Sequence, residues 1–298
     1  IRDRNQQTEQ LSPLSSRPIY TETENDLTVK ANKRTFIFSK KDGQLKGVSV
    51  DNRKISFANG PRFIGARRAD RSLDQFYNHD DEKAKEKDRT YSEFPDAAVF
   101  TKLDVKEDGG NLVVTANYKL GNLDKAQWTI NPSGELALDY TYNFSGVVDL
   151  MGIRFDYPED QVISKRWLGA GPYRVWQNRI HGTQYDVWEN DYNDPIPGET
   201  FTYPEFKGYF GDVSWMNIQT KEGTISLTNE TPDAYIGVYQ PRDGRDRLLY
   251  TLPESGISVL NVIPPVRNKV NSTDLCGPSS QPKWVNGPQT GRVIFRFM

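Results

Sequence analysis

The sequence predicts an all-β fold, built as a large antiparallel sandwich. Short runs of alternating or β-branched residues recur from Leu27 to Met298, and turn-forming Gly, Asn and Asp residues separate them. The sequence has no Gly-rich phosphate loop, no heptad pattern, no alternation of strands with helices and no repeat of 20 to 50 residues. Strands joined by short turns pair as antiparallel meanders. A chain of 298 residues can also bury a full core, so we expect one main domain.

The expected strands follow the chain in order, with turns such as KDG, EDGG and NPSG between them. They are residues 27–31, 34–39, 45–50, 98–105, 111–120, 125–130, 135–144, 151–157, 212–219, 224–229, 234–240, 257–263 and 292–298.

Two segments depart from this pattern. Residues 72–94 are highly charged, which indicates a short helix or an exposed excursion between strands. Residues 1–25 are rich in Thr, Ser, Gln, Glu and Pro, so we interpret them as a tail or linker and residues 26–298 as the domain. Because the chain opens with Ile1 followed by a polar stretch, we expect an upstream domain to precede it.

Composition excludes several classes of partner. The formal net charge is only −2 and charged residues make up 26% of the chain, which gives no electrostatic field to gather nucleic acid or anionic lipid. No apolar run approaches the roughly 18 residues that a membrane helix needs. Cys276 is the single cysteine, so an internal disulfide is excluded. We therefore expect neither a nucleic acid nor a membrane as partner.

Residues 166–179, RWLGAGPYRVWQNR, have a composition that suits a sugar-facing loop. Trp167 and Trp176 offer flat apolar faces, while Arg174 and Arg179 can donate forked hydrogen bonds. Carbohydrate needs both, because its C–H faces stack on aromatic rings and its hydroxyls need directed partners. The alternative is a core tryptophan beside an exposed turn.

This segment resembles the W-L-G-x-G-P-x-x-x-Y-x-D-R signature in the C-terminal domain of family 2 glycoside hydrolases, the β-galactosidase type. Trp176 stands at the Tyr position, Asn178 at the Asp position, and Arg179 matches. Further segments that resemble the family occur in the same order, at 27–55, 60–70, 210–229 and 274–284. The resemblance implies a β-supersandwich of the galactose mutarotase-like fold, which follows the catalytic barrel and borders its active site.

Three positions depart from the family pattern. Cys276 stands where a late loop of the galactosidases carries a sugar-stacking Trp, with Trp284 or Trp176 as substitutes. Arg174 and Val175 replace a Glu-Asn pair, and GARRAD replaces a segment that contains an aromatic residue. The identity of the sugar is therefore open.

Residues 181–212 form a second long segment, rich in aromatic and acidic residues, which we expect to be an ordered loop. Its aromatic residues Tyr185, Trp188 and Tyr192 either wall a sugar cleft or clamp the loop onto the sandwich. Its oxygen-bearing side chains are candidate ligands for a calcium or sodium ion, or they are solvated loop residues; they are Asp191, Asn193, Asp194 and Glu199.

Catalysis within this chain has little support in the sequence. Only His79 and His181 are available, which is too few for a zinc site or a convincing catalytic triad. In the resembled family both catalytic Glu residues lie in a (β/α)8 barrel, whose alternation is missing here. We assign no catalytic residue and no certain cofactor.

The resulting expectation is an accessory, carbohydrate-contacting domain of a β-galactosidase-like enzyme. Its partners would be carbohydrate and the upstream catalytic domain of the same polypeptide, in a periplasmic or extracellular location. The alternatives are an independent aldose epimerase-like enzyme and a freestanding carbohydrate-binding module. We expect three loops, at 166–179, 181–212 and 274–278, to converge on one concave face. The candidate contacts are Trp176, Arg179, Trp188, Asp274 and, more weakly, His181.

Overall fold

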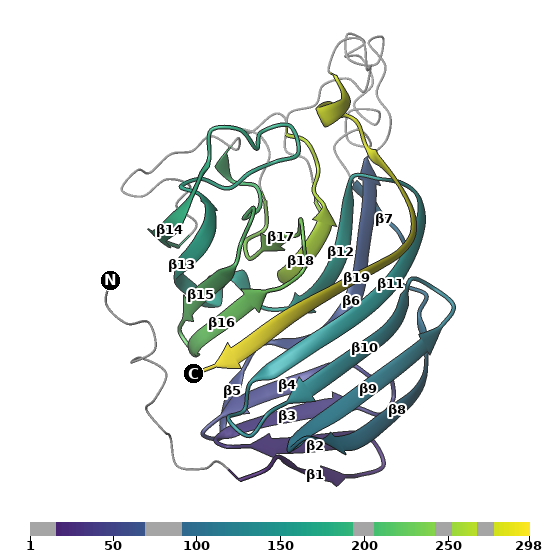
Figure 1. Cartoon of the computed structure of the whole chain (residues 1–298). Helices are drawn as coiled ribbons and strands as arrows, with labels where there is room; N and C mark the ends of the chain where they lie inside the picture. Colours follow the sequence, from purple (N-terminus) through teal and green to yellow (C-terminus); the bar gives the residue numbers. More distant parts are fainter. Residues whose placement is uncertain (1–15, 69–90, 193–205, 242–251, 267–276) are drawn as a thin grey trace.

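The computed structural model describes residues 16–68, 91–192, 206–241, 252–266 and 277–298, and in these ranges it consists of two large antiparallel sheets (Figure 1). Two short 3-10 turns accompany the strands, η2 (Glu159–Gln161) and η4 (Pro278–Ser280). The strands are β1 (Ile19–Glu22), β2 (Asp26–Ala31), β3 (Arg34–Ser39), β4 (Leu45–Val50), β5 (Arg53–Ile55), β6 (Ala58–Arg68), β7 (Tyr91–Glu93), β8 (Val99–Asp108), β9 (Asn111–Lys119), β10 (Leu123–Ile130), β11 (Leu136–Val148), β12 (Leu150–Asp156), β13 (Val162–Gly171), β14 (Gln184–Asp191), β15 (Trp215–Thr220), β16 (Gly223–Asn229), β17 (Tyr235–Gly237), β18 (Ile257–Val262) and β19 (Lys283–Phe297).

The first sheet runs β1-β2-β3-β4-β6-β12-β18-β17, with β5 paired to β4 and β7 to β6. The second sheet runs β14-β13-β15-β16-β19-β11-β10-β9-β8. Consecutive strands form meanders, as short turns require. Distant segments also pair: β6 lies beside β12, and the C-terminal strand β19 lies between β16 and β11.

The longest pairing joins β11 to β19, from Leu136↔Phe295 to Val148↔Lys283. Side chains alternate across these strands, because successive residues of a strand point to opposite faces. Leu138, Tyr140 and Tyr142 of β11 are buried, while Asn143 and Ser145 are exposed. The inward set forms one wall of the core between the sheets.

Aromatic side chains from both sheets meet in this core. Phe57 stacks on Phe155 with 4.7 Å between ring centroids, and its ring lies 5.0 Å from that of Phe295. Trp128 is fully buried and contacts Phe38 and Phe155 at 5.9 and 6.0 Å. Rings of the first sheet therefore pack directly against rings of the second, which is why the two layers form one body.

The structure confirms the predicted all-β antiparallel sandwich. Every expected strand overlaps an observed one. The sequence pattern missed β1, β5, β6, β7, β13 and β14, whose burial does not alternate cleanly.

Two predicted boundaries need comment. Within the predicted tail, Ile19–Glu22 forms the edge strand β1, paired with β2. Of the predicted excursion at 72–94, residues 72–90 lie outside the described ranges, and Tyr91–Glu93 forms β7.

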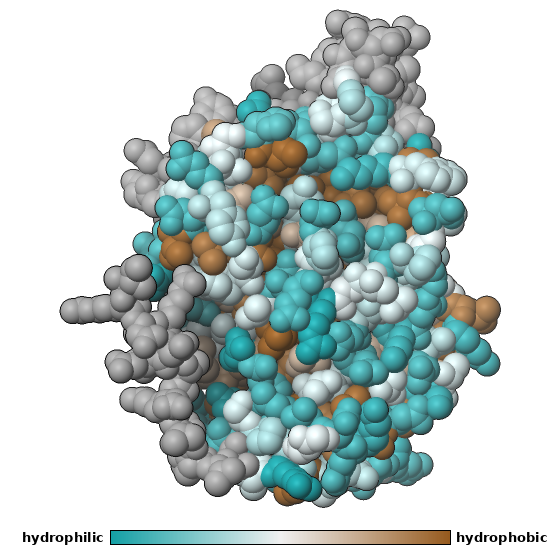
Figure 2. All heavy atoms as spheres, viewed as in Figure 1, coloured by the Kyte–Doolittle hydropathy of each residue, from teal (hydrophilic) through white to brown (hydrophobic). Residues whose placement is uncertain are grey.

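The face in Figure 2 is mostly hydrophilic or neutral, with apolar groups scattered over it. Within the described residues, no helix is long and apolar enough to cross a membrane.

Candidate functional site

Only the second part of the sugar-facing segment predicted at 166–179 is a loop. Its first part belongs to β13, which pairs with β14 as far as Gly171↔Gln184. Trp167 lies on this strand and is fully buried, with its ring edge-on to Phe210 at 5.0 Å and its indole N–H donating to the Ala170 carbonyl at 3.0 Å. For Trp167 the core alternative is therefore correct. The true loop, residues 172–183, joins β13 to β14.

Three distant segments hold this loop in place. Val175 exchanges two backbone hydrogen bonds with Tyr209, at 2.7 and 2.8 Å. The Asn178 side chain does the same with the backbone of Val266, accepting from its N–H at 2.9 Å and donating to its carbonyl at 3.0 Å.

The third contact is made by the Gln177 amide, which donates to the carbonyls of Ser279 and Gln281 at 2.9 and 2.7 Å. Residues 206–210, 264–266 and 277–281 thus surround the loop. Parts of the segments predicted at 166–179 and 181–212 do meet, while the third contact falls on Ser279 and Gln281, directly after the predicted loop 274–278. Ser279 belongs to η4, which lies near the top of Figure 1.

A pocket of about 370 Å³ opens where the loop turns. Tyr173 and Phe206 form one wall, with ring centroids 4.8 Å apart and ring planes at 67°. Asn178, Arg179 and His181 supply polar groups around it. The volume lies within the usual range for small-molecule sites, and the lining combines an apolar wall with a few convergent polar groups.

Arg179 and His181 are the polar groups available to a ligand. Both are exposed, and neither side chain has a hydrogen bond or ion pair within the described part of the chain. The Tyr173 hydroxyl donates to the backbone carbonyl of His181 at 3.2 Å, which fixes the backbone of His181 beside the aromatic wall. No carboxylate is among the described residues that line the pocket. The arrangement therefore offers a ligand one aromatic wall and one forked donor, whose positive charge no described lining residue offsets.

Trp176 does not have the exposure expected of a sugar contact. We expected a partly exposed ring, but only 1% of the residue is exposed. Its ring packs edge-on against Tyr209 at 5.9 Å, within a second buried cluster that includes Leu260 and Ile263. The tight turn from Trp176 to Arg179 folds the indole inward, so this expectation is wrong and the ring serves packing.

Two further candidates lie elsewhere. Trp188 is on β14, directly opposite Trp167, and its indole N–H donates to the carbonyls of Gly169 and Gln184 at 3.2 Å each. It clamps the hairpin and does not line the described pocket. Asp274 lies outside the described residues.

The expectation of one long loop at 181–212 is wrong in its first part, because Gln184–Asp191 is a strand.

Arg174, expected to offer a forked donor, is buried. Its guanidinium carbon lies 4.9 Å from the ring centroid of Tyr239 and 5.9 Å from that of Phe210. Burial lowers the pKa of Arg174 to about 10, and the neighbouring Glu159 and Tyr192 counteract this shift. The residue therefore packs beneath the loop as a cation against aromatic rings.

Sequence reasoning did not select Tyr173, Asn178 and Phe206 as contacts. Asn178 stood at a signature position, Tyr173 lies within the same 166–179 segment, and Phe206 lies in the aromatic-rich 181–212 segment. Their role depends on the backbone contact between residues 174 and 206, which no local pattern reveals.

The proposed ion site stays a prediction. The described residues contain no group of three or more His, Cys, Asp or Glu side chains placed to hold a metal. Asp191 is exposed at the end of β14, and the other three candidates lie outside the described ranges.

Comparison with known families identifies the chain. Residues 30–266 match the model of the β-galactosidase small chain family, which covers β3 to β18 and the whole loop that carries the pocket. The chain belongs to the β-galactosidase small chain family. The predicted resemblance to a β-galactosidase small chain is thereby confirmed.

Curated proteins give no match to the chain. Among solved structures it is similar to a galactose 1-epimerase from Lactobacillus acidophilus NCFM, at 10% identity over 95% of this chain and 99% of the other, with a TM-score of 0.45. It is also similar to a galactose mutarotase-like protein from Clostridium acetobutylicum, at 9% identity, 94% and 98% coverage and a TM-score of 0.42.

Proposed function

We propose that this β-galactosidase small-chain domain contacts carbohydrate through the pocket of the 172–183 loop. It would act as an accessory domain beside the catalytic barrel of a family 2 glycoside hydrolase. The observation that carries the proposal is the position of Arg179. This residue matches the resembled signature, and its guanidinium lies beside an aromatic wall with no hydrogen bond or ion pair to any described residue.

The chemistry of the pocket favours a sugar over other small ligands. A pyranose presents C–H groups on one face, which pack against rings such as Tyr173 and Phe206. Its hydroxyls accept from the forked N–H groups of Arg179, and each can donate to the His181 side chain.

The alternative of an epimerase-like enzyme fits the pocket less well. That chemistry pairs an acid-base His with a carboxylate, and His181 has no carboxylate beside it among the described lining residues. We therefore expect the chain by itself not to hydrolyse aryl β-galactosides above a heat-inactivated control. Turnover that a single carboxylate substitution abolished would favour the independent enzyme instead.

Binding tests the proposal directly. We would titrate the chain with lactose and methyl β-galactoside, following backbone amide shifts of residues 173–183 by NMR. Arg179→Ala should weaken binding about tenfold or more, because a hydrogen bond to a charged group is lost. Arg166→Ala is the matched control, since Arg166 is exposed on β13 and, among the described residues, forms an ion pair with Glu189 alone, at 3.9 Å. Equal affinities for the two variants would reject the site.

A further inference from the structure

The largest described cavity lies away from the loop pocket and shares no residue with it. It has a volume of about 750 Å³ and opens where β6 begins and β12 ends. Segments after β17 and before β18 form the opposite wall, through Val238 and Gln240 on one side and Glu254 and Gly256 on the other. We call this cavity the bulge groove.

A β-bulge creates the groove. Arg154 of β12 pairs with Arg62 of β6, but two residues later Asp156 pairs with Ala58. Residues 59–61 therefore lie opposite Phe155 alone, and the extra residues push the β6 backbone outward. At Gly60 a Cβ would come within 2.3 Å of the Phe155 ring, so the bulge needs glycine there.

The bulge directs hydrogen-bonding side chains at the groove. Asn59 adopts a left-handed backbone, with φ of 52°, and its amide donates to Asp156 Oδ2 at 2.8 Å. Arg62 donates to the other oxygen of the same carboxylate. The side-chain oxygen of Asn59, Oδ1, has no hydrogen-bond partner within the described residues, so it can still accept a hydrogen bond. Bulges that re-aim side chains are common next to functional sites.

The groove carries charges of both signs. Lys54, Arg62 and Arg154 face four carboxylates, so neither an anion nor a cation finds a field of one sign. The carboxylates of Asp160 and Glu254 and the amine of Lys54 have no hydrogen-bond or ion-pair partner in the described part of the chain. Acceptors and donors are thus interspersed along one cavity. A ligand whose groups both donate and accept suits such a lining best.

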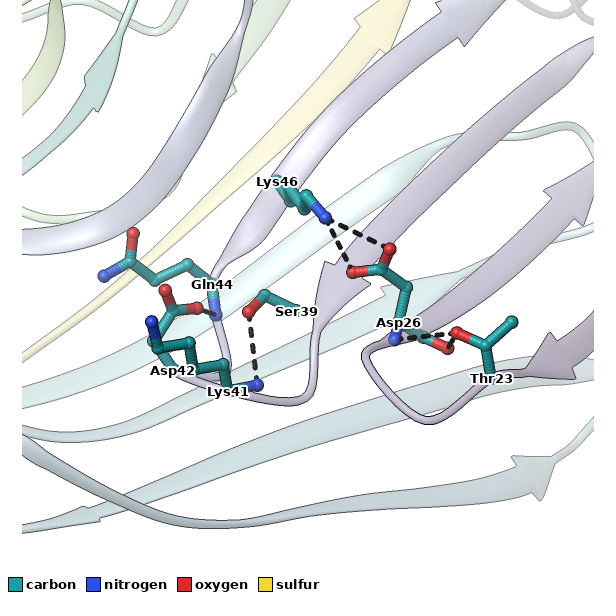
Figure 3. A network of polar contacts seen from close by, with 7 residues as sticks. All are labelled: Thr23, Asp26, Ser39, Lys41, Asp42, Gln44 and Lys46. Atoms are coloured by element: carbon teal, nitrogen blue, oxygen red, sulfur yellow. Dashed lines mark hydrogen bonds and ion pairs between the residues drawn. The ribbon is translucent and has the colours of Figure 1, made fainter.

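A second cavity of about 320 Å³ adjoins the bulge groove, and Asn59 lines both. Figure 3 shows its rim, where Lys46 bridges both oxygens of Asp26 at 2.9 and 3.1 Å. On the same rim, Asp42 accepts from the Gln44 N–H at 3.1 Å and Ser39 accepts from the Lys41 N–H at 3.2 Å. These bonds fix the rim before any ligand arrives, which lowers the entropy cost of binding.

We propose that the bulge groove binds a neutral oligosaccharide of two or three residues, as a second carbohydrate site separate from the loop pocket. Sugar hydroxyls donate and accept at once, and the volumes of the two adjoining cavities suit a short chain better than a monosaccharide. The inference does not require the loop pocket to bind carbohydrate.

The test compares sugars of different charge on the whole chain. Cellotriose and β-1,4-galactotriose are the neutral probes, trigalacturonate is the anion and chitosan trimer is the cation. We expect the neutral probes to shift the backbone amides of Asn59, Gln240 and Gly256. Tighter binding of either charged trimer would overturn the assignment of ligand class, and no shift with any probe would overturn the site.

Asn59→Gly is the decisive variant, because glycine keeps the left-handed backbone while the amide is lost. It should weaken neutral binding about threefold to tenfold. Asn32→Gly is the matched control, since Asn32 is an exposed asparagine with φ of 53° in the β2–β3 turn.

Arg179→Ala should leave binding at the groove unchanged, which separates failure of this inference from failure of the loop pocket. Loss of groove binding in Asn32→Gly or Arg179→Ala, or full retention in Asn59→Gly, would contradict the proposal.

Discussion

The interior between the two sheets and the cluster under the 172–183 loop both bury large aromatic side chains, but they hold them differently. In the interior, rings such as Trp128 and Phe155 come from regular strands whose alternation directs them inward. In the loop cluster, Trp176 and Tyr209 come from irregular backbone. A few hydrogen bonds between segments remote in sequence fix that backbone. The interior therefore depends on side-chain volume, whereas the loop cluster depends on close backbone approach.

The largest expected effect is in the interior. Trp128→Ala removes a fully buried ring that contacts Phe38 and Phe155, and should cost about 3–5 kcal/mol of unfolding free energy. Trp284→Ala, at a site that is 70% exposed, should change it by less than about 0.5 kcal/mol. Urea unfolding followed by circular dichroism measures both. A similar cost for the two variants would mean that the interior does not depend on this ring.

Backbone approach in the loop cluster can be tested with a single methyl group. In Gly208→Ala the new Cβ would lie 2.0 Å from the Val175 carbonyl oxygen. This clash would push Val175 away from Tyr209 and break their backbone hydrogen bonds. We expect the free energy of unfolding to fall by about 1–3 kcal/mol. Amide hydrogen exchange should also become faster in residues 173–179.

The control for that variant is Gly47→Ala, where the new Cβ meets no heavy atom within 4 Å. Its melting temperature should stay close to that of the unsubstituted protein. If Gly208→Ala behaved in the same way, the loop would not depend on close backbone contact.

High pH tests one tyrosine from each region. Burial raises the pKa of Tyr140, in the interior, to about 12 and that of Tyr209, in the loop cluster, well above its usual 10. The unfolded chain loses these protons near pH 10, whereas the folded chain retains them. Stability is therefore full below pH 10. Above pH 10, the free energy of unfolding falls by about 1.4 kcal/mol per pH unit for each tyrosine, until the pH reaches the pKa of that tyrosine in the folded protein.

Phenylalanine variants isolate this contribution. Tyr209→Phe and Tyr140→Phe should each reduce the loss of stability between pH 10 and 12, measured by unfolding at fixed pH beside tyrosinate absorbance. An unchanged pH slope in Tyr209→Phe would indicate that the loop cluster opens before this residue titrates.

Part of the candidate site was predictable and part was not. Arg179 and His181 were chosen from their place in and beside the segment that resembles the family signature, and both line the pocket. Trp176 was chosen for the same reason and is buried, because composition does not tell which face of a ring other segments cover. Phe206 lines the pocket through a backbone contact to residue 174 that crosses about thirty residues of chain.

The sequence by itself determined where most strands lie and which family the chain resembles. Alternation and turn residues are local properties, so LTVKA, NLVVTANYKL and RVIFRFM each predict a strand without reference to the rest of the chain. Tertiary structure alone decided which strands are neighbours, that β14 is a strand at all, and that the bulge between β6 and β12 opens a groove. The physical reason is that burial and pairing depend on which remote surface completes the contact. That information lies in the packing of the two sheets and in no single segment of the chain.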